Sequence, residues 1–130
     1  MPPKVSVVIP VYNVGKQLEK CLDSVVAQTF PDIEIIVVND GSTDNSPEII
    51  ARYADEDSRI VVIDKSNEGL AYARKSGIEA AQGEYIQHLD GDDFLEPDAI
   101  ELLYNKAIEE KADMVVFPFW FDYVDEKKKR

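Results

Sequence analysis

Three carboxylates stand within four residues, in the tetrad Asp90-Gly91-Asp92-Asp93 directly after the apolar run Tyr85–Leu89. Carboxylates held this close repel one another in a folded loop unless a positive charge lies among them. Mg²⁺ and Mn²⁺ prefer oxygen ligands and commonly bridge a few carboxylates to a diphosphate. The alternative is a solvated acidic turn, because Asp and Gly are ordinary turn residues. The tetrad alone leaves both interpretations open.

Polar side chains also follow three other apolar runs of the chain. Tyr12 comes at the end of the first run, Asn39–Asp44 follows the second, and Arg74 stands shortly after the third. Each has an ordinary explanation: a half-buried aromatic at a strand end, a simple turn, and a surface ion pair. The four groups together are much less expected by chance than any one of them, so they favour a ligand site that includes a metal.

Short β-rich runs alternate with longer stretches of helical period, and this alternation predicts how the polar groups are positioned. The predicted strands are Val5–Val11, Ile33–Val38, Ile60–Ile63, Tyr85–Leu89 and Met114–Phe119. Helices are predicted through Leu18–Val26, Ser46–Ala54, Leu70–Ala80 and Pro97–Ile108. We expect Ser46 to be an N-cap, Gly83 to be the C-terminal cap of the third helix, and Pro97 to start the fourth helix.

This order of elements predicts an α/β fold with a mostly parallel sheet flanked by helices on both faces. In such sheets, ligands bind beyond the carboxyl ends of the strands. The polar groups that follow the strands are therefore expected to meet at one edge of the sheet.

Composition restricts the class of protein further. The chain has 130 residues and a net charge of −12, which argues against nucleic acid as a partner because phosphate backbones are bound by clustered Lys and Arg. Its single cysteine, Cys21, is expected to be a buried structural thiol on a helix face. No apolar run approaches the roughly 18 residues of a membrane span, and no signal peptide is recognisable, so we expect a cytoplasmic protein.

The ordered set of motifs resembles the amino-terminal half of a family 2 glycosyltransferase with the GT-A (Rossmann-like) fold. The matching segments are Val5–Asn13, Gln28–Phe30, Val37–Asp44, Asn67–Gly69 with Ala73 and Arg74, and Gly83–Ile86 leading into Asp90–Asp93. Each segment is a weak signal alone, but together they span nearly the whole chain in the family's order.

The resemblance implies roles at the nucleotide end of a donor site. Pro10 and Tyr12 would help to form the pocket for the base, typically uracil, and Asp40 would accept a hydrogen bond from that base. Arg74 would assist the base or the phosphates. Asp90 would face the ribose or the sugar.

The resemblance also implies a divalent cation, Mn²⁺ or Mg²⁺, as cofactor. Asp92 would bind this ion where it bridges the diphosphate, and Asp93 would support the loop. The implied reaction transfers a sugar from a nucleotide-diphosphate donor, expected to be a UDP-sugar, to an acceptor hydroxyl with inversion. The acceptor would be a saccharide or a lipid-linked saccharide, which would place the protein in the cytoplasm, or peripherally at the inner face of the membrane.

The resemblance does not identify a general base within this sequence. In the family this group lies in a later segment, so we expect it beyond Arg130 and name no catalytic residue. Residues 1–130 would then be the nucleotide-sugar-binding part of the domain, truncated on its carboxyl-terminal side, and this part alone would be inactive in transfer. The alternative is a non-catalytic nucleotide-sugar-binding module of the same fold.

Two positions depart from the family pattern, and rival families fit less well. Ser76 stands where Asn is common, and His88 replaces an apolar residue; we expect His88 to be packed and hydrogen-bonded. A phosphatase of the haloacid dehalogenase type would carry its Asp-x-Asp after the first strand, with Thr or Val where Phe94 stands. The glycine motifs of dinucleotide-binding dehydrogenases and P-loop nucleotidases are absent from the sequence.

Overall fold

The computed structural model describes residues 2–110 of the chain. Its elements, in chain order, are β1 (Val5–Val11), α1 (Gly15–Val26), β2 (Ile33–Asp40), α2 (Ser46–Glu56), β3 (Ile60–Lys65), α3 (Leu70–Ala80), β4 (Tyr85–His88) and α4 (Ala99–Glu110). Four predicted strands and four predicted helices are therefore present, with ends that shift by a few residues. The fifth predicted strand, Met114–Phe119, lies outside the described residues.

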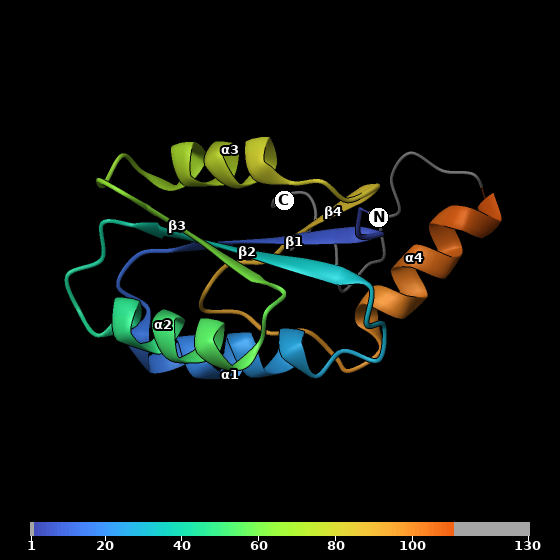
Figure 1. Ribbon diagram of the computed structural model, residues 1–130, viewed down its shortest axis with the longest axis horizontal. Helices are drawn as coiled ribbons and strands as arrows, with labels where there is room; N and C mark the ends of the chain where they lie inside the picture. The colour runs from blue at the N-terminus through green and yellow to red at the C-terminus, as the bar shows by residue number, and fades with distance from the viewer. Residues whose placement is uncertain (1, 111–130) are drawn as a thin grey trace.

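The four strands form one parallel sheet in the order β3-β2-β1-β4. Helix α3 covers one face of this sheet, and α1 and α2 cover the other (Figure 1). All seven residues of β1 are buried, as expected for a strand with a neighbour on each side and helices on both faces. The predicted α/β fold with helices on both faces is confirmed.

The main core lies between the sheet and the side that carries α1 and α2. Helix α1 buries Leu18, Cys21, Leu22 and Val25 against it, the stripe that the sequence period predicted. Cys21 is confirmed as a buried thiol, and burial together with the nearby acidic tetrad raises its pKa. A thiol with a raised pKa is a poor nucleophile, so its role is in packing.

Helix α3 packs close to the opposite face through small residues. Ala73 and Gly77 are its buried residues. A Cβ atom on Gly77 would come within 2.4 Å of Val8 Cγ1, so only glycine permits this separation. The close packing brings the amino-terminal end of α3 next to the ends of the strands.

Three predicted helix boundaries were wrong. Asn45, not Ser46, is the N-cap of α2, and its side chain makes no cap hydrogen bond. The backbone amide of Ser46 donates to Asp44 Oδ1 at 2.9 Å. Helix α3 ends at Ala80, and its C-cap residue, Ala81, has an extended conformation. Gly83 lies beyond that cap, where its N–H donates to Ser6 Oγ at 2.8 Å.

Helix α4 starts at Ala99, two residues after the predicted start at Pro97. The carbonyl of Pro97 is used elsewhere, since it accepts a hydrogen bond from the Thr29 amide at 3.0 Å. Within residues 2–110, no helix combines the length and the apolar character that crossing a bilayer requires.

Candidate functional site

A pocket of about 440 Å³ lies at the carboxyl ends of the strands, a size suited to a small-molecule ligand. Its lining residues are Pro10, Val11, Tyr12, Val14, Asp40, Asn67, Gly69, Leu70, Ala73, Asp90, Gly91 and Asp92. They come from the ends of β1, β2 and β4 and from the start of α3. The chain crosses over between β1 and β4, and such a switch in strand order is where open α/β sheets bind ligands.

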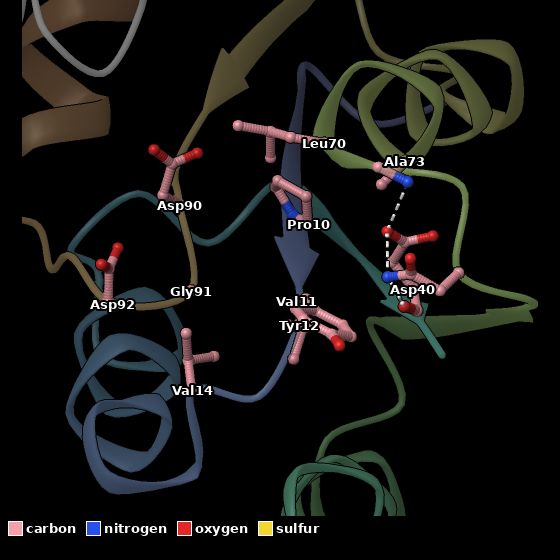
Figure 2. Close-up of a pocket in the computed structure, with 12 residues that line it drawn as sticks. Pro10, Val11, Tyr12, Val14, Asp40, Leu70, Ala73, Asp90, Gly91 and Asp92 are labelled. Carbon is pink, nitrogen blue, oxygen red and sulfur yellow. Dashed lines mark hydrogen bonds between the residues drawn. The ribbon is translucent and has the colours of Figure 1, made fainter. Parts of the chain in front are cut away.

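Five of the six residues predicted from the sequence line this one pocket: Pro10, Tyr12, Asp40, Asp90 and Asp92. In Figure 2, Asp90 and Asp92 lie on one side and Asp40 on the other, with Pro10 and Tyr12 between them. The sixth, Arg74, is outside the lining but reaches the pocket through Asp90. The pocket therefore has an acidic end and an Asp40 end, joined by an aromatic and a proline ring.

The acidic end is fixed to the sheet by backbone hydrogen bonds that continue beyond β4. The amide of Leu89 donates to Val8 O at 3.0 Å, and the amide of Gly91 donates to Pro10 O at 3.3 Å. Cys21 supports the same turn from α1, with its Sγ 3.6 Å from the carbonyl oxygen of Asp90. The tetrad is thus held directly beside Pro10.

The donor set of this end fits a hard divalent cation. Asp90, Asp92 and Asp93 each offer a carboxylate oxygen, and these atoms lie within 4.8 Å of one another. Asp92 is exposed, and within residues 2–110 its side chain makes no hydrogen bond or ion pair. Its oxygens are therefore available as ligands, and oxygen-rich sites suit Mg²⁺ or Mn²⁺.

Arg74 supplies the positive charge beside the tetrad. Its guanidinium donates to Asp90 Oδ1 at 2.9 Å, and both side chains are about one-third exposed. Ala73 of α3 is buried, and the next residue of the helix, Arg74, carries this charge beside the tetrad. The pair compensates one of the three clustered carboxylates and leaves a partly exposed cation near the pocket.

Asp40 ends β2 as a buried carboxylate that holds the loop before α3. Its Oδ1 accepts the Glu68 amide at 3.0 Å, and its Oδ2 accepts the Gly69 amide at 3.0 Å. The side chain of Asn67 donates to Oδ2 as well, at 3.2 Å. Lys65 Nζ lies 3.7 Å from Oδ1. Asp40 therefore shapes the pocket as well as lining it.

The neighbouring Gly41 permits this contact between loops. It has φ of +71°, and a Cβ atom there would lie 2.6 Å from the Asn67 amide nitrogen. A side chain at residue 41 would therefore be strained and would push the loop of residues 67–69 away from Asp40.

A glutamine fixes the segment that follows the tetrad. Gln28 Nε2 donates to Glu96 O at 2.6 Å, and Gln28 Oε1 accepts the amide of Ile100 at 3.0 Å. The sequence alone indicates no role for the motif Gln28–Phe30. The structure gives the role of this motif: Gln28 is buried two residues after the end of α1, and it binds the first turn of α4.

His88 is largely buried as expected, but one of its ring nitrogens lacks the predicted hydrogen bond within the described part of the chain. Its Nδ1 is buried, and within residues 2–110 it has no hydrogen-bond partner. Burial lowers the pKa of His88, and the charge of Arg74 lowers it further, while Asp90 acts in the opposite direction. The lowered pKa favours the neutral form of His88, which lies close enough to Arg74 and Asp90 to sense both charges.

Sequence reasoning assigned no role to several residues that build the pocket. Asn67 and Gly69 were only part of a motif, and Leu70 was only part of a helix period; all three line the pocket. Asn13 was quoted without a function, yet its side chain binds the loop after β2. A left-handed φ of 51° at Asn13 marks it as unusual, but that conformation is visible only in the structure.

The comparisons with known proteins agree with this geometry. The family model described as glycosyl transferase family 2 matches residues 6–130. Glycosyltransferase GlyA of Streptococcus pneumoniae serotype 4 (strain ATCC BAA-334 / TIGR4) is 48% identical over 113 residues, which are 87% of this chain and 16% of that protein. The chain thus covers only a small part of this relative.

Two solved structures share the fold. S. aureus TarS 1-349 in complex with UDP aligns with a TM-score of 0.78 and 28% identity, over 83% of this chain and 33% of that one. The mannosyltransferase PcManGT from Pyrobaculum calidifontis, in complex with GDP-Man and Mn²⁺, aligns with a TM-score of 0.71 and 27% identity, over 91% of this chain and 34% of that one. The chain therefore spans about one-third of each of these two proteins.

Proposed function

The chain belongs to glycosyl transferase family 2, and from this premise we propose that its pocket binds a UDP-sugar as the donor for glycosyl transfer. The observation that carries the proposal is the single pocket in which Tyr12, Asp40 and Asp92 meet. It provides a carboxylate at one end and an aromatic ring beside it for a base, and acidic oxygens at the other end for a metal-bound diphosphate. A nucleotide-diphosphate sugar has the same order of chemical groups.

The base would lie at the Asp40 end of the pocket. Uracil has an N–H flanked by two carbonyls, and Asp40 Oδ1 could accept a hydrogen bond from it because that oxygen holds only one close hydrogen bond, from Glu68. The half-exposed ring of Tyr12 would cover one face of the base. TarS has been crystallised with UDP, whereas PcManGT has been crystallised with GDP-Man; the choice of uracil is therefore the part of the proposal that needs testing.

The diphosphate would lie at the acidic end, with Asp92 as the metal ligand. Asp90 would face the ribose or the sugar, and Asp93 would support the loop. A bound Mn²⁺ or Mg²⁺ would supply charge stabilisation for the leaving diphosphate, which gains negative charge as the glycosidic bond breaks. Arg74, held beside Asp90, would add a second positive charge on the same side.

The reaction proposed is a direct displacement with inversion. The acceptor oxygen forms a bond to the anomeric carbon as the bond to the diphosphate oxygen breaks, and a general base takes the acceptor proton. We assign no described residue to that base and expect it beyond Arg130. Residues 1–130 would then bind the donor without transferring its sugar, and a saccharide or lipid-linked acceptor at the cytoplasmic face of a membrane would be bound by later segments.

Calorimetric titration of nucleotides into the purified chain tests the donor site. UDP should bind in the presence of Mn²⁺, more weakly with excess chelator, and more tightly than GDP in either condition. Equal affinity for GDP would refute uracil recognition, and no nucleotide binding at all would refute the donor site.

A transfer assay separates the enzyme from its alternative, a non-catalytic binding module of the same fold. Release of UDP from a UDP-sugar in the presence of saccharide acceptors should require a form of the protein extended beyond Arg130. If such a form binds UDP but never releases it from a sugar donor, the binding module is the correct interpretation.

A further inference from the structure

The side chain of Asn13 joins the loop after β1 to the loop after β2. Its Oδ1 accepts the backbone amide of Thr43 at 2.7 Å and that of Asp44 at 3.3 Å. Its Nδ2 donates to Thr43 Oγ1 at 3.3 Å, and its backbone N–H donates to Ser42 Oγ at 3.1 Å. One asparagine thus binds three successive residues that lie about 30 positions away in the chain.

The second loop also binds the first. Asp44 Oδ2 accepts the Gly15 amide at 3.0 Å. Desolvation alone would raise the pKa of Asp44, but the hydrogen bonds from Ser46 and Gly15 outweigh it and lower the pKa, which keeps the carboxylate charged as an acceptor. The contact between the two loops is therefore reciprocal.

Both loops carry pocket residues at their ends. Asn13 lies between Tyr12 and Val14, which line the pocket, and the loop that Asn13 binds begins directly after Asp40. Tyr12 and Asp40 are the two residues placed at the base end of the donor pocket. The contact therefore connects the segment that carries Tyr12 to the segment that follows Asp40.

We propose that Asn13 is a positioning residue for base selectivity, acting through Tyr12 and Asp40 rather than by touching the nucleotide. The inference rests on the proposed donor site. Asp40 can choose among bases only if the base is presented at a fixed distance from its oxygen, and Tyr12 supplies the surface that presents it. Loosening the Asn13 contact therefore reduces the difference in affinity between bases that differ only in the group facing Asp40.

Because Asn13 lies at the surface, its positioning role can be tested without a large loss of overall stability. Its side chain is exposed, so water replaces most of the bonding lost on substitution, and global stability depends on the core elsewhere. Asn13 also adopts φ of 51°, which Asn and Gly tolerate better than other residues. Asn13→Gly therefore removes the side-chain contact while preserving the backbone conformation.

Uridine and cytidine diphosphates are the matched probes. They share ribose, diphosphate and ring size, but uracil carries an N3–H beside a C4 carbonyl, where cytosine has an N3 acceptor beside a 4-amino group. Their dissociation constants, measured by calorimetry with Mn²⁺, give a selectivity ratio from which effects on the diphosphate end cancel. We expect the parent chain to favour UDP by about tenfold or more, the worth of one hydrogen bond.

Four variants test the role. Asn13→Gly should reduce the ratio to about two- or threefold, whereas Asn13→Asp, which keeps the acceptor for the Thr43 and Asp44 amides, should retain most of it. Thr43→Ala, which removes one partner from the other side, should give an intermediate value. Asn45→Gly is the matched control, because Asn45 lies beside the contact but makes no side-chain cap hydrogen bond, and it should leave the ratio unchanged.

Hydrogen exchange without nucleotide gives an independent measurement. The amides of Thr43 and Asp44 should exchange faster in Asn13→Gly, with a melting temperature within a few degrees of the parent chain. Faster exchange with an unchanged selectivity ratio would overturn the proposal, as would an equal loss of affinity for both nucleotides. Failure of the parent chain to bind UDP is a different outcome: it refutes the donor site itself, and the role of Asn13 with it.

Discussion

Arg74 donates a 2.9 Å hydrogen bond to Asp90 and so joins helix α3 to the acidic turn after β4. One residue belongs to α3 and the other follows β4, and they are 16 positions apart in the chain. Because Asp90 belongs to the three-carboxylate cluster, the pair brings a cation to the end of the pocket where a diphosphate is expected.

Arg74→Gln should weaken UDP binding by about tenfold, because it removes the positive charge beside the proposed diphosphate position and releases Asp90. Lys75→Gln is the matched control. Lys75 is the next residue of α3 and is exposed, and the substitution makes the same change of charge. Calorimetry on both variants measures the difference. Equal losses would mean that only the net charge of α3 matters, not the contact with Asp90.

Asp92→Asn should abolish the effect of Mn²⁺ on UDP affinity, since Asp92 has the exposed carboxylate with no other partner within residues 2–110. The affinity without metal should change by less than about twofold, because one repulsive charge is also lost. Asp98→Asn, at an exposed position outside the cluster, is the control. If Mn²⁺ still increases the UDP affinity of the Asp92→Asn variant, Asp92 is not the metal ligand.

Asp40→Ala should weaken UDP binding and also destabilise the fold. The substitution leaves the amides of Glu68 and Gly69 without their acceptor, at a cost of about 2 kcal/mol in the free energy of unfolding. Mn²⁺ binding should be unchanged, because the acidic turn lies across the pocket (Figure 2). Denaturant unfolding and metal titration measure both effects, with the exposed Asp55→Ala as the control for stability.

A different result would revise the role of Asp40. If Asp40→Ala lowers stability but binds UDP as tightly as the parent chain, then Asp40 only holds the loop of residues 67–69 and does not contact the base. If it weakens UDP and GDP equally, the loop supports the pocket without selecting the base.

The stability of the metal-free chain should fall as the pH decreases from about 7.5 to 5.5. Burial lowers the pKa of His88 below its ordinary value of 6.5 in the folded chain. The unfolded chain therefore takes up a proton at a pH where the folded chain does not, and this favours unfolding as the pH falls. His88 is the only histidine of the chain, and the carboxyl groups with lowered pKa values, Asp44 and Asp57, titrate below this window.

Denaturant unfolding at several pH values, with chelator present, checks this prediction. The His88→Gln variant should show a smaller decrease over the same range because glutamine does not titrate. Identical pH dependence of the two proteins would show that His88 titrates with its ordinary pKa in the folded chain.

The sequence alone determined the order and type of the elements. Hydrophobic periodicity is a local property, so the stripe from Leu18 to Val25 and the continuous apolar run Val5–Val11 identified a helix and a fully buried strand without knowledge of their partners. Local signals failed at helix ends. Ser46 was misassigned because its amide donates to Asp44, two residues earlier, and Gly83 because its amide donates to Ser6, 77 positions away in the chain.

The tertiary structure decided which side chains meet. The strand order β3-β2-β1-β4 puts the tetrad beside Pro10, and no periodicity encodes that neighbourhood. The motifs identified Asp40, Arg74 and Asp92, but not that Asp40 holds the Gly69 loop or that Asn13 joins two loops. Such contacts join residues about 30 positions apart, and they form only when the packing of the strands has brought their ends to one edge of the sheet.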